Sequence, residues 1–268
     1  ARIEGDKSFA KKLMRETGIP TAEARIFGPT AQELAQARQA GKGSDEAPGQ
    51  WYQSGYDMAK SYVSTREEGV VVKASGLAKC KGVFVHHDPS EALDTIERLM
   101  VKRELGNAGA RVVIEELLLG PEVSVLALVD GKSIYILESA SDHKRLGEQD
   151  TGPNTGGMGA FSPSTFLTEP DLAIIEKDIE YRGVLYAGII MTAGGPKVLE
   201  FNCRLGDPET QPILMRLESD LLEAIEATLD GRLDQIEMKW SRRASVCVVM
   251  ASGGYPGDYE KGFAISGL

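Results

Sequence analysis

The sequence contains few cysteines, no long apolar run and fewer basic than acidic residues. Its three cysteines, Cys80, Cys203 and Cys247, are odd in number and widely spaced, so they predict neither a disulfide framework nor a zinc motif. This usage favours a reducing, cytoplasmic setting. No stretch is apolar for long enough to span a bilayer, and residues 1–6 lack the apolar core of a signal peptide. We therefore expect no membrane partner.

The shortage of basic charge argues against a nucleic-acid partner. Lys and Arg number 30 against 40 Asp and Glu, which gives a formal net charge of −10. A general nucleic-acid binder needs a basic surface, whereas a local anion site needs only a few lysines and backbone amides. The chain has 268 residues, of which 42% are hydrophobic. At roughly 150 residues per domain, this length predicts about two domains, and the composition is that of a globular protein.

Hydrophobic periodicity predicts an α+β fold in which neighbouring strands form antiparallel hairpins. A strong turn signal, Asp130-Gly131, joins two of these strands. The glycine-rich segments 41–55 and 142–163 are expected to be loops, the second a functional one because of its length. The expected helices are 7–17, 31–40, 58–63, 88–100, 172–179 and 218–229. The expected strands are 70–74, 83–86, 111–115, 122–128, 133–137, 184–191, 197–203 and 244–251, the last of them buried.

Lys73 ends the otherwise apolar strand 70–74. A lysine at this position either emerges into a site with an anionic partner or extends its ammonium to solvent at the strand end, and the residue alone does not decide. The following loop, 75–82, carries Lys79 and Lys81 among small residues. Such a loop suits phosphate binding, although it is not a Walker A loop and a mobile basic turn has the same composition.

Strand 198–204 places Glu200, Asn202 and Arg204 on one face, because side chains alternate along a strand. The residues between them would face the core. A carboxylate beside a carboxamide is a hard-oxygen pair suited to Mg²⁺, and an arginine nearby can grip a carboxylate or phosphate through two hydrogen bonds. A half-exposed polar strand face is the simpler alternative, but the density of polar residues here favours a site.

The glycine-rich segment 154–160 offers successive backbone amides with little side-chain obstruction, which predicts an anion-binding nest. Charged residues of both signs, at 142–145, stand just upstream. A flexible linker is the alternative, although Asn, Met and Pro embedded among the glycines favour a site.

Four segments together resemble one family. They are VVVKASGLA (70–78), DHKRL (142–146), GPNTGGMGA (152–160) and VLEFNCR (198–204). The chain is similar to the glycinamide ribonucleotide synthetases (phosphoribosylamine–glycine ligases), ATP-grasp enzymes of purine biosynthesis. The resemblance extends from ARIEG at the start of the chain to GGYPG at 253–257.

The resemblance implies an ATP-grasp fold, in which two α+β lobes with antiparallel sheets close over ATP. It implies a chain that lacks the N-terminal domain and most of the C-terminal domain. Residues 1–59 would begin the core, 60–127 form the lid, 128–240 complete the core with its metal and substrate loops, and 241–268 begin the final domain. The implied reaction joins glycine to 5-phosphoribosylamine through glycyl phosphate, with ATP and Mg²⁺ or Mn²⁺.

The resemblance also implies roles for individual residues. It assigns the ATP phosphates to Lys73 and Lys81, and the ribose hydroxyls to Glu122. It makes Glu200 and Asn202 the metal pair and Lys73, Arg204 and Asp142 the catalytic residues. Adenine would be read by the backbone of Glu115, Glu116, Leu117 and Leu118. The loop with Asn154, Thr155, Gly156 and Gly157 would complete the binding site on the side of glycine and phosphoribosylamine.

Two other readings stay open at this point. One is a different ATP-grasp carboxylate–amine ligase, against which the segments at 142–145 and 154–160 count. The other is a nucleotide-binding fragment without turnover, which the unusual Lys79-Cys80 pair in the phosphate loop favours. In some eukaryotes this activity belongs to a longer multifunctional purine enzyme, and the sequence is compatible with such an origin.

Overall fold

The fold follows from how each strand divides its side chains between two faces. The computed structural model describes residues 2–29, 33, 50–78, 82–149, 151–166 and 181–267. The expected helix 172–179, nearly all of the expected helix 31–40, and Lys81 therefore lie outside the described residues. Two compact units divide the chain: Ala1–Leu119 with Lys197–Phe201, and Gly120–Pro196 with Asn202–Leu268. The four-part division expected from the sequence remains a prediction.

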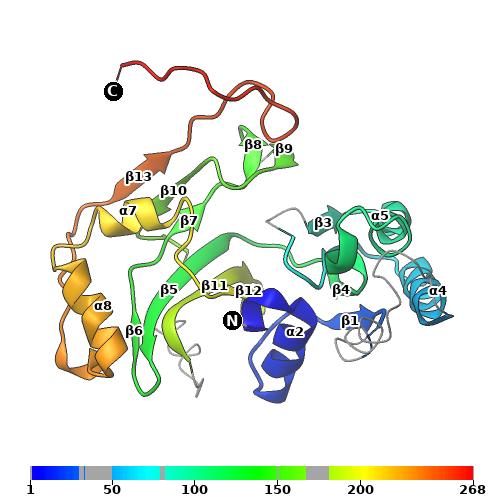
Figure 1. Cartoon of the computed structure of the whole chain (residues 1–268), viewed down its shortest axis with the longest axis horizontal. Coiled ribbons are helices and arrows are strands. Elements are labelled where there is room, and N and C mark those ends of the chain that lie inside the picture. Colours follow the sequence, from blue (N-terminus) through cyan, green and yellow to red (C-terminus); the bar gives the residue numbers. More distant parts are fainter. Residues whose placement is uncertain are drawn as a thin grey trace. The chain divides into compact units, whose positions relative to one another are not determined.

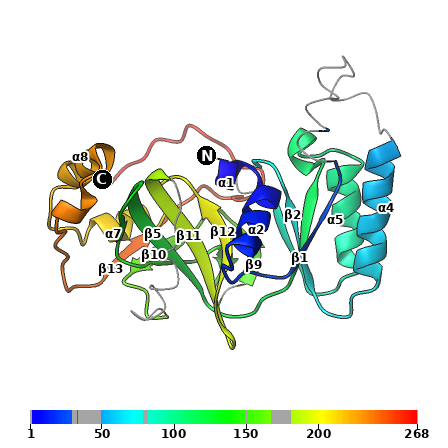
Figure 2. The same ribbon diagram turned by 90° about the horizontal axis from the view of Figure 1, so that it is seen from below.

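The elements of the first unit are α1 (Arg2–Gly5), α2 (Lys7–Glu16), β1 (Ala24–Phe27), α4 (Gln50–Ser64), β2 (Val70–Ala74), β3 (Val83–His86), α5 (Glu91–Met100), a 3-10 turn (Gly106–Gly109) and β4 (Val112–Glu116). The four strands form an antiparallel sheet in the order β1–β4–β2–β3. The helices α4 and α5 run alongside this sheet (Figures 1 and 2).

The two faces of this sheet have different characters. Val70, Val72 and Ala74 of β2 share a buried core with α4 and α5, as do Val112 and Ile114 of β4. Because side chains alternate along a strand, Lys73 and Glu115 lie on the opposite face. The register pairs Lys73 with Val113 and Val71 with Glu115, which makes Lys73 and Glu115 diagonal neighbours across the two strands.

The second unit contains β5 (Glu122–Asp130), β6 (Ile134–Ile136), β7 (Ser141–Asp142), β8 (Arg145–Gly147), β9 (Thr151–Asn154), β10 (Gly159–Ser162), β11 (Arg182–Thr192), α7 (Thr210–Leu214), α8 (Leu221–Asp230), a 3-10 turn (Leu233–Gln235) and β13 (Ser245–Val248). The boundary between the units runs within β12 (Gly195–Asn202). The sheets have the orders β12–β11–β5–β6, β13–β10–β7 and β8–β9. Leu126 and Leu128 of β5 and Tyr186 of β11 pack against α7, α8 and Met238.

Most expected elements are present, and the Asp130-Gly131 hairpin between β5 and β6 is confirmed. Among the helices that the structure describes, none is long and apolar enough to cross a membrane. Three expectations were wrong. The expected loop 41–55 ends in helix, because α4 begins at Gln50. Gly55 lies inside that helix, where an added Cβ would stand 2.8 Å from the Cα of Gly28, so it permits close packing rather than a turn.

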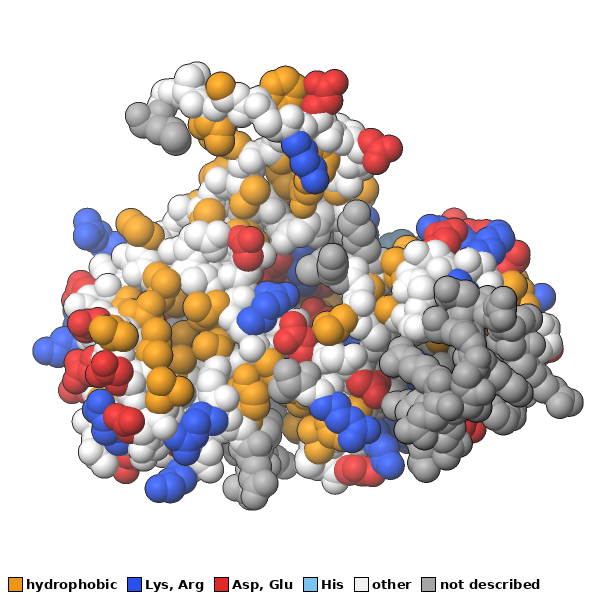
Figure 3. All heavy atoms as spheres, in the orientation of Figure 1, with side chains coloured by type: hydrophobic (Ala, Val, Ile, Leu, Met, Phe, Trp, Pro, Cys, Tyr) orange, Lys and Arg blue, Asp and Glu red, His pale blue; other side chains and the backbone are white. Residues whose placement is uncertain are grey.

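The other two corrections concern the second unit. The expected loop 142–163 contains the short strands β8, β9 and β10, whose glycine content hid their alternation. Strand β13 is not buried, because Val246 and Val248 are 73% and 76% exposed. Hydrophobic side chains continue along the segment after β13, at the top of Figure 3.

Candidate functional site

A buried cluster of three charged side chains lies on the face of the first unit's sheet that is opposite α4 and α5. Lys73 Nζ is 3.1 Å from Glu115 Oε2, and Lys11 Nζ of helix α2 is 3.1 Å from Glu115 Oε1. The side chain of Lys73 is 6% exposed, that of Lys11 is 3% exposed and that of Glu115 is 2% exposed. Of the two alternatives left open for Lys73, extension of its ammonium to solvent is therefore excluded, because the ammonium is buried and paired with Glu115.

Polar groups of two further segments fix this cluster in place. Lys73 Nζ donates to the carbonyl of Leu199 at 3.1 Å. Lys11 Nζ donates to the hydroxyl of Thr21 at 2.6 Å, and that hydroxyl donates to the carbonyl of Val198 at 2.6 Å. Two ammonium groups thus share one carboxylate, which leaves the cluster with an excess of positive charge suited to an anion.

The sequence did not point to Lys11. Its neighbours Ala10 and Met14 belong to the buried face of α2, and Lys11 is buried beside them. A lysine within an apolar helix stripe was the available signal. Burial, the largest influence, lowers the pKa of Lys11 from its ordinary 10.5 to about 8, against the opposing attraction of Glu115.

The expected adenine-reading segment, 115–118, has part of its backbone already paired. Glu116 donates its N–H to the carbonyl of Glu23 at 3.0 Å, and Leu117 donates to Gly69 at 3.2 Å. The Glu116 carboxylate accepts from Lys197 at 2.9 Å. In this structure these two amides are therefore not donors for a base, and the role of Leu118 and of the carbonyls stays a prediction.

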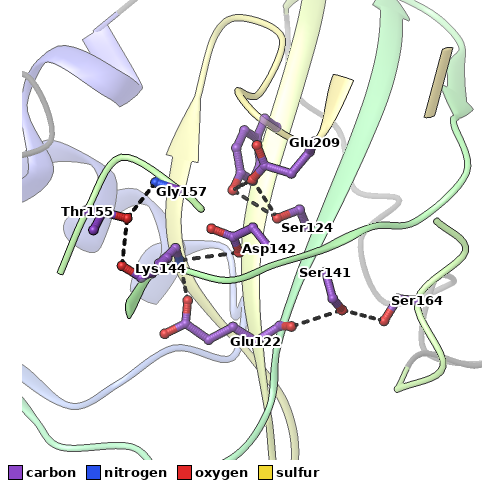
Figure 4. Close-up of polar contacts among 10 residues, drawn as sticks. Glu122, Ser124, Ser141, Asp142, Lys144, Thr155, Gly157, Ser164 and Glu209 are labelled. Atoms are coloured by element: carbon purple, nitrogen blue, oxygen red, sulfur yellow. Dashed lines mark hydrogen bonds and ion pairs between the residues drawn. The ribbon is translucent and has the colours of Figure 1, made fainter. Parts of the chain in front are cut away.

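A second polar cluster lies in the second unit, around β7 and the segment after it (Figure 4). Lys144 pairs with Glu122, the residue expected to accept from ribose, and lies 3.9 Å from Asp142 Oδ1. Burial lowers the pKa of Lys144, but the carboxylates of Glu122 and Asp142 outweigh this effect and raise the pKa above its ordinary value. The cluster thus holds one cation between two acids.

Asp142 is the most unusual member of this cluster. Its side chain is 4% exposed, and within the described part of the chain its Oδ1 atom has no hydrogen-bond donor. Burial raises the pKa of Asp142 from 3.8 to about 6, although Lys144 opposes the rise. A buried carboxyl that titrates near neutrality and retains an acceptor atom is suited to proton transfer.

Glu209 is a second buried acidic residue of this cluster, for which the sequence predicted no role. Glu209 Oε1 accepts from Tyr186 at 2.6 Å and from Ser124 at 2.9 Å. Burial and then Glu209 raise the pKa of Tyr186, so its hydroxyl keeps its proton. The only sequence signal near Glu209 was the density of polar residues around strand 198–204, because its partners come from β5 and β11, far away in the sequence.

The glycine-rich loop is held by its own amides rather than open to an anion. Thr155 and Met158 donate their N–H groups to the carbonyls of Lys144 and His143, each at 2.7 Å. Gly156 donates to the hydroxyl of Tyr255 at 2.8 Å, and Gly157 to the hydroxyl of Thr155 at 3.0 Å. The expectation of an open anion nest was wrong for this structure, because each of these amides already has an acceptor.

Gly157 also explains why this loop requires glycine. Its φ is +120°, and an added Cβ would lie 2.3 Å from Cδ of Pro208. The loop therefore packs closely on the segment that carries Asp207 and Glu209. Asn154, exposed at the end of β9, keeps its expected binding role as a prediction.

The substitution Tyr255→Phe is expected to release one end of this loop. Loss of the bond to the Gly156 amide should lower the free energy of unfolding by about 1 kcal/mol. It should also speed hydrogen exchange of that amide relative to those of Thr155 and Met158, measured by NMR. Exchange at Gly156 that is unchanged in the variant would show that Tyr255 does not hold the loop. Tyr259→Phe is the matched control, since Tyr259 contacts Tyr255 by its ring.

The expected metal pair lies on β12. Glu200 and Asn202 are two residues apart in the strand and so share a face. Asn202 is only 8% exposed, so this face is more buried than expected. Arg204 is exposed and donates to the carbonyl of Leu205 at 3.0 Å.

Within the described ranges, no group of three or more His, Cys, Asp or Glu side chains is arranged to hold a metal. The carboxylate and carboxamide oxygens of Glu200 and Asn202 nevertheless fit Mg²⁺, which commonly uses one or two protein oxygens and completes its shell with water and phosphate. The metal role of this pair stays a prediction.

Comparison with known proteins decides the family. A family model described as phosphoribosylglycinamide synthetase, ATP-grasp (A) domain, matches residues 47–210. The chain belongs to this family. The resemblance and the ATP-grasp fold expected from the sequence are thereby confirmed.

Relatives in bacteria and animals match the whole chain. A phosphoribosylamine–glycine ligase of Rhodopirellula baltica is 46% identical over 100% of this chain and 60% of its own length. The trifunctional purine biosynthetic protein adenosine-3 of Drosophila melanogaster is 44% identical over 100% of this chain and 19% of its own length.

A solved structure of phosphoribosylamine–glycine ligase from Thermotoga maritima superposes with a TM-score of 0.79 at 31% identity. That match covers 98% of this chain and 63% of the other. The chain therefore spans about three fifths of the length of the single-function ligases it matches.

Proposed function

We propose that this chain carries the ATP-dependent ligation of glycine to 5-phosphoribosylamine. The observation that carries the proposal is the match over its entire length to proteins named phosphoribosylamine–glycine ligase, at 46% identity for the relative from Rhodopirellula baltica. In this reaction the glycine carboxylate attacks the γ-phosphate of ATP and releases ADP. The amine of phosphoribosylamine then displaces phosphate from glycyl phosphate to give glycinamide ribonucleotide.

In the first unit, Lys73 supplies positive charge to the phosphates of ATP. An ammonium has three N–H donors, and those of Lys73 face Glu115 and the carbonyl of Leu199, which leaves one for a phosphate oxygen. Phosphoryl transfer depends on positioning and charge neutralisation more than on covalent protein groups. Lys81 has the same proposed role in the neighbouring loop.

Glu200 and Asn202 would hold Mg²⁺, which would supply positive charge next to the phosphates of ATP. In the second unit, Asp142 accepts the proton that the attacking amine loses, since its Oδ1 is an acceptor without a donor among the described residues. Arg204 binds a carboxylate or phosphate of the substrates. Glu122 accepts hydrogen bonds from the ribose hydroxyls in this proposal, while it stays paired with Lys144.

We propose small-molecule substrates only, without nucleic acid or membrane, and a cytoplasmic location. The acidic net charge of −10 and the three scattered cysteines support these assignments. The trifunctional relative from Drosophila melanogaster supports a place within a longer multifunctional protein.

Titration with ATP, followed by calorimetry with and without Mg²⁺, tests the nucleotide site. The wild-type chain should bind more tightly with Mg²⁺, and Asn202→Ala should lose about tenfold in affinity only when Mg²⁺ is present. The control is Lys12→Ala, whose side chain is 72% exposed and paired with Glu16. An equal loss with and without Mg²⁺ would remove Asn202 from the metal site.

The reaction itself is tested by ADP formation. Mg-ATP turnover should require glycine and increase when phosphoribosylamine is added. Turnover that another amine supports equally well would point to a different carboxylate–amine ligase. Nucleotide binding without any glycine-dependent turnover would favour a binding fragment.

A further inference from the structure

Lys11 has no role in the reaction described so far, yet it is among the most deeply buried charged side chains of the first unit. It comes from α2 and reaches the same carboxylate that pairs with Lys73. Each oxygen of Glu115 thus faces a different ammonium. Burying a charge is costly unless it is paired, and a second buried lysine beside a single carboxylate is more than pairing Lys73 requires.

We propose that Lys11 is a positioning residue that draws part of the Glu115 charge away from Lys73 and so keeps the Lys73 ammonium available to phosphate. The inference rests on the proposed function, because it takes Lys73 as the group that binds the phosphates of ATP. With Lys11 in place the cluster has one net positive charge. Without Lys11, the negative charge of Glu115 would cancel the positive charge of Lys73, and the cluster would have no net charge.

The surrounding contacts hold Lys11 where this role requires it. The Thr21 hydroxyl accepts from Lys11 at 2.6 Å and donates to Val198 at 2.6 Å. Lys73 donates to the next carbonyl of the same strand, Leu199, at 3.1 Å. The two lysines are therefore anchored to consecutive residues of β12, with Glu115 between them.

Loss of the Lys11 proton should have the same effect as loss of its side chain. The charged groups that face Lys11 are Glu115 and Glu116 on β4 and Lys73 on β2, and Glu116 is in turn paired with Lys197 of β12. Because burial lowers the pKa of Lys11 to about 8, this proton leaves within an accessible pH range. Phosphate affinity should therefore fall as the pH rises through that value.

The test measures Mg-ADP affinity by calorimetry across a pH range of about 7 to 9.5, where the nucleotide phosphates stay ionised. Wild-type affinity should fall about tenfold across this range. Lys11→Met should bind about tenfold more weakly at pH 7 and lose the pH dependence. Lys11→Arg, which keeps its charge throughout, should bind well and also lose the pH dependence. Lys12→Met is the exposed control and should behave as wild type.

A second variant guards against loss of folding in Lys11→Met. Thr21→Val removes only the hydroxyl that holds Lys11, and should lower affinity at pH 7 with a weaker pH dependence. Wild-type binding that does not change with pH would overturn the inference, as would a Lys11→Met variant that binds like wild type. Absence of any Mg-ADP binding by the folded wild-type chain would overturn the proposed function as well.

Discussion

Replacing Glu115 with glutamine is expected to lower the free energy of unfolding by about 3–5 kcal/mol, because it leaves Lys11 and Lys73 buried without a counter-charge. Glutamine has nearly the same shape as glutamate, so the change removes charge with little change in packing. Urea unfolding followed by circular dichroism gives the free energy. The matched control is Glu16→Gln, which alters a 62% exposed partner of Lys12 and should cost less than about 1 kcal/mol.

A double variant shows whether the cost comes from the two lysines. Adding Lys11→Met to Glu115→Gln removes one of the two unpaired charges, so the double variant should be more stable than the sum of the single changes predicts. Strict additivity would mean that Lys11 and Glu115 do not interact. A small cost for Glu115→Gln alone would mean that Glu115 does not compensate the buried charge of the two lysines.

The first unit shows how far the sequence determines this site. The apolar alternation of residues 70–74 predicted β2 and placed Lys73 within it, and the resemblance identified Lys73 as a phosphate residue. Residues near 115 were expected to act through their backbone. In the structure the side chain of Glu115 takes the central place, because the antiparallel register makes it a diagonal neighbour of Lys73. Register between strands that are forty residues apart has no local signal.

The glycine-rich loop illustrates a different limit. Composition singled out 154–160 as an anion nest, but the structure shows that Gly157 is needed for its close approach to Pro208. Whether an amide is free depends on acceptors that arrive from elsewhere, such as the hydroxyl of Tyr255, 99 residues away in the sequence. Glycine content therefore predicts where the backbone can approach another group closely. It does not predict which group accepts the hydrogen bonds of the backbone amides there.

The substitution Asp142→Asn is expected to stabilise the chain at neutral pH while abolishing ligation. Burial raises the pKa of Asp142 from 3.8 to about 6, so the folded protein holds this proton more tightly than the unfolded chain. Stability from this group is complete at low pH and is lost as the pH rises from about 4 to 6. At pH 7 the charged carboxyl then costs roughly 3 kcal/mol, a cost that asparagine avoids.

The measurement compares urea unfolding of wild type and Asp142→Asn between about pH 4 and 7. The difference in stability between them should shift in favour of the variant by about 2.4 kcal/mol over this range, whereas Asp94→Asn, at a 66% exposed side chain, should show no such shift. Identical pH profiles would mean that Asp142 titrates at its ordinary pKa. Loss of a general base should lower the ligation rate at least about a hundredfold. A variant that is both more stable and inactive would show that the fold tolerates a buried carboxylate because the reaction requires one.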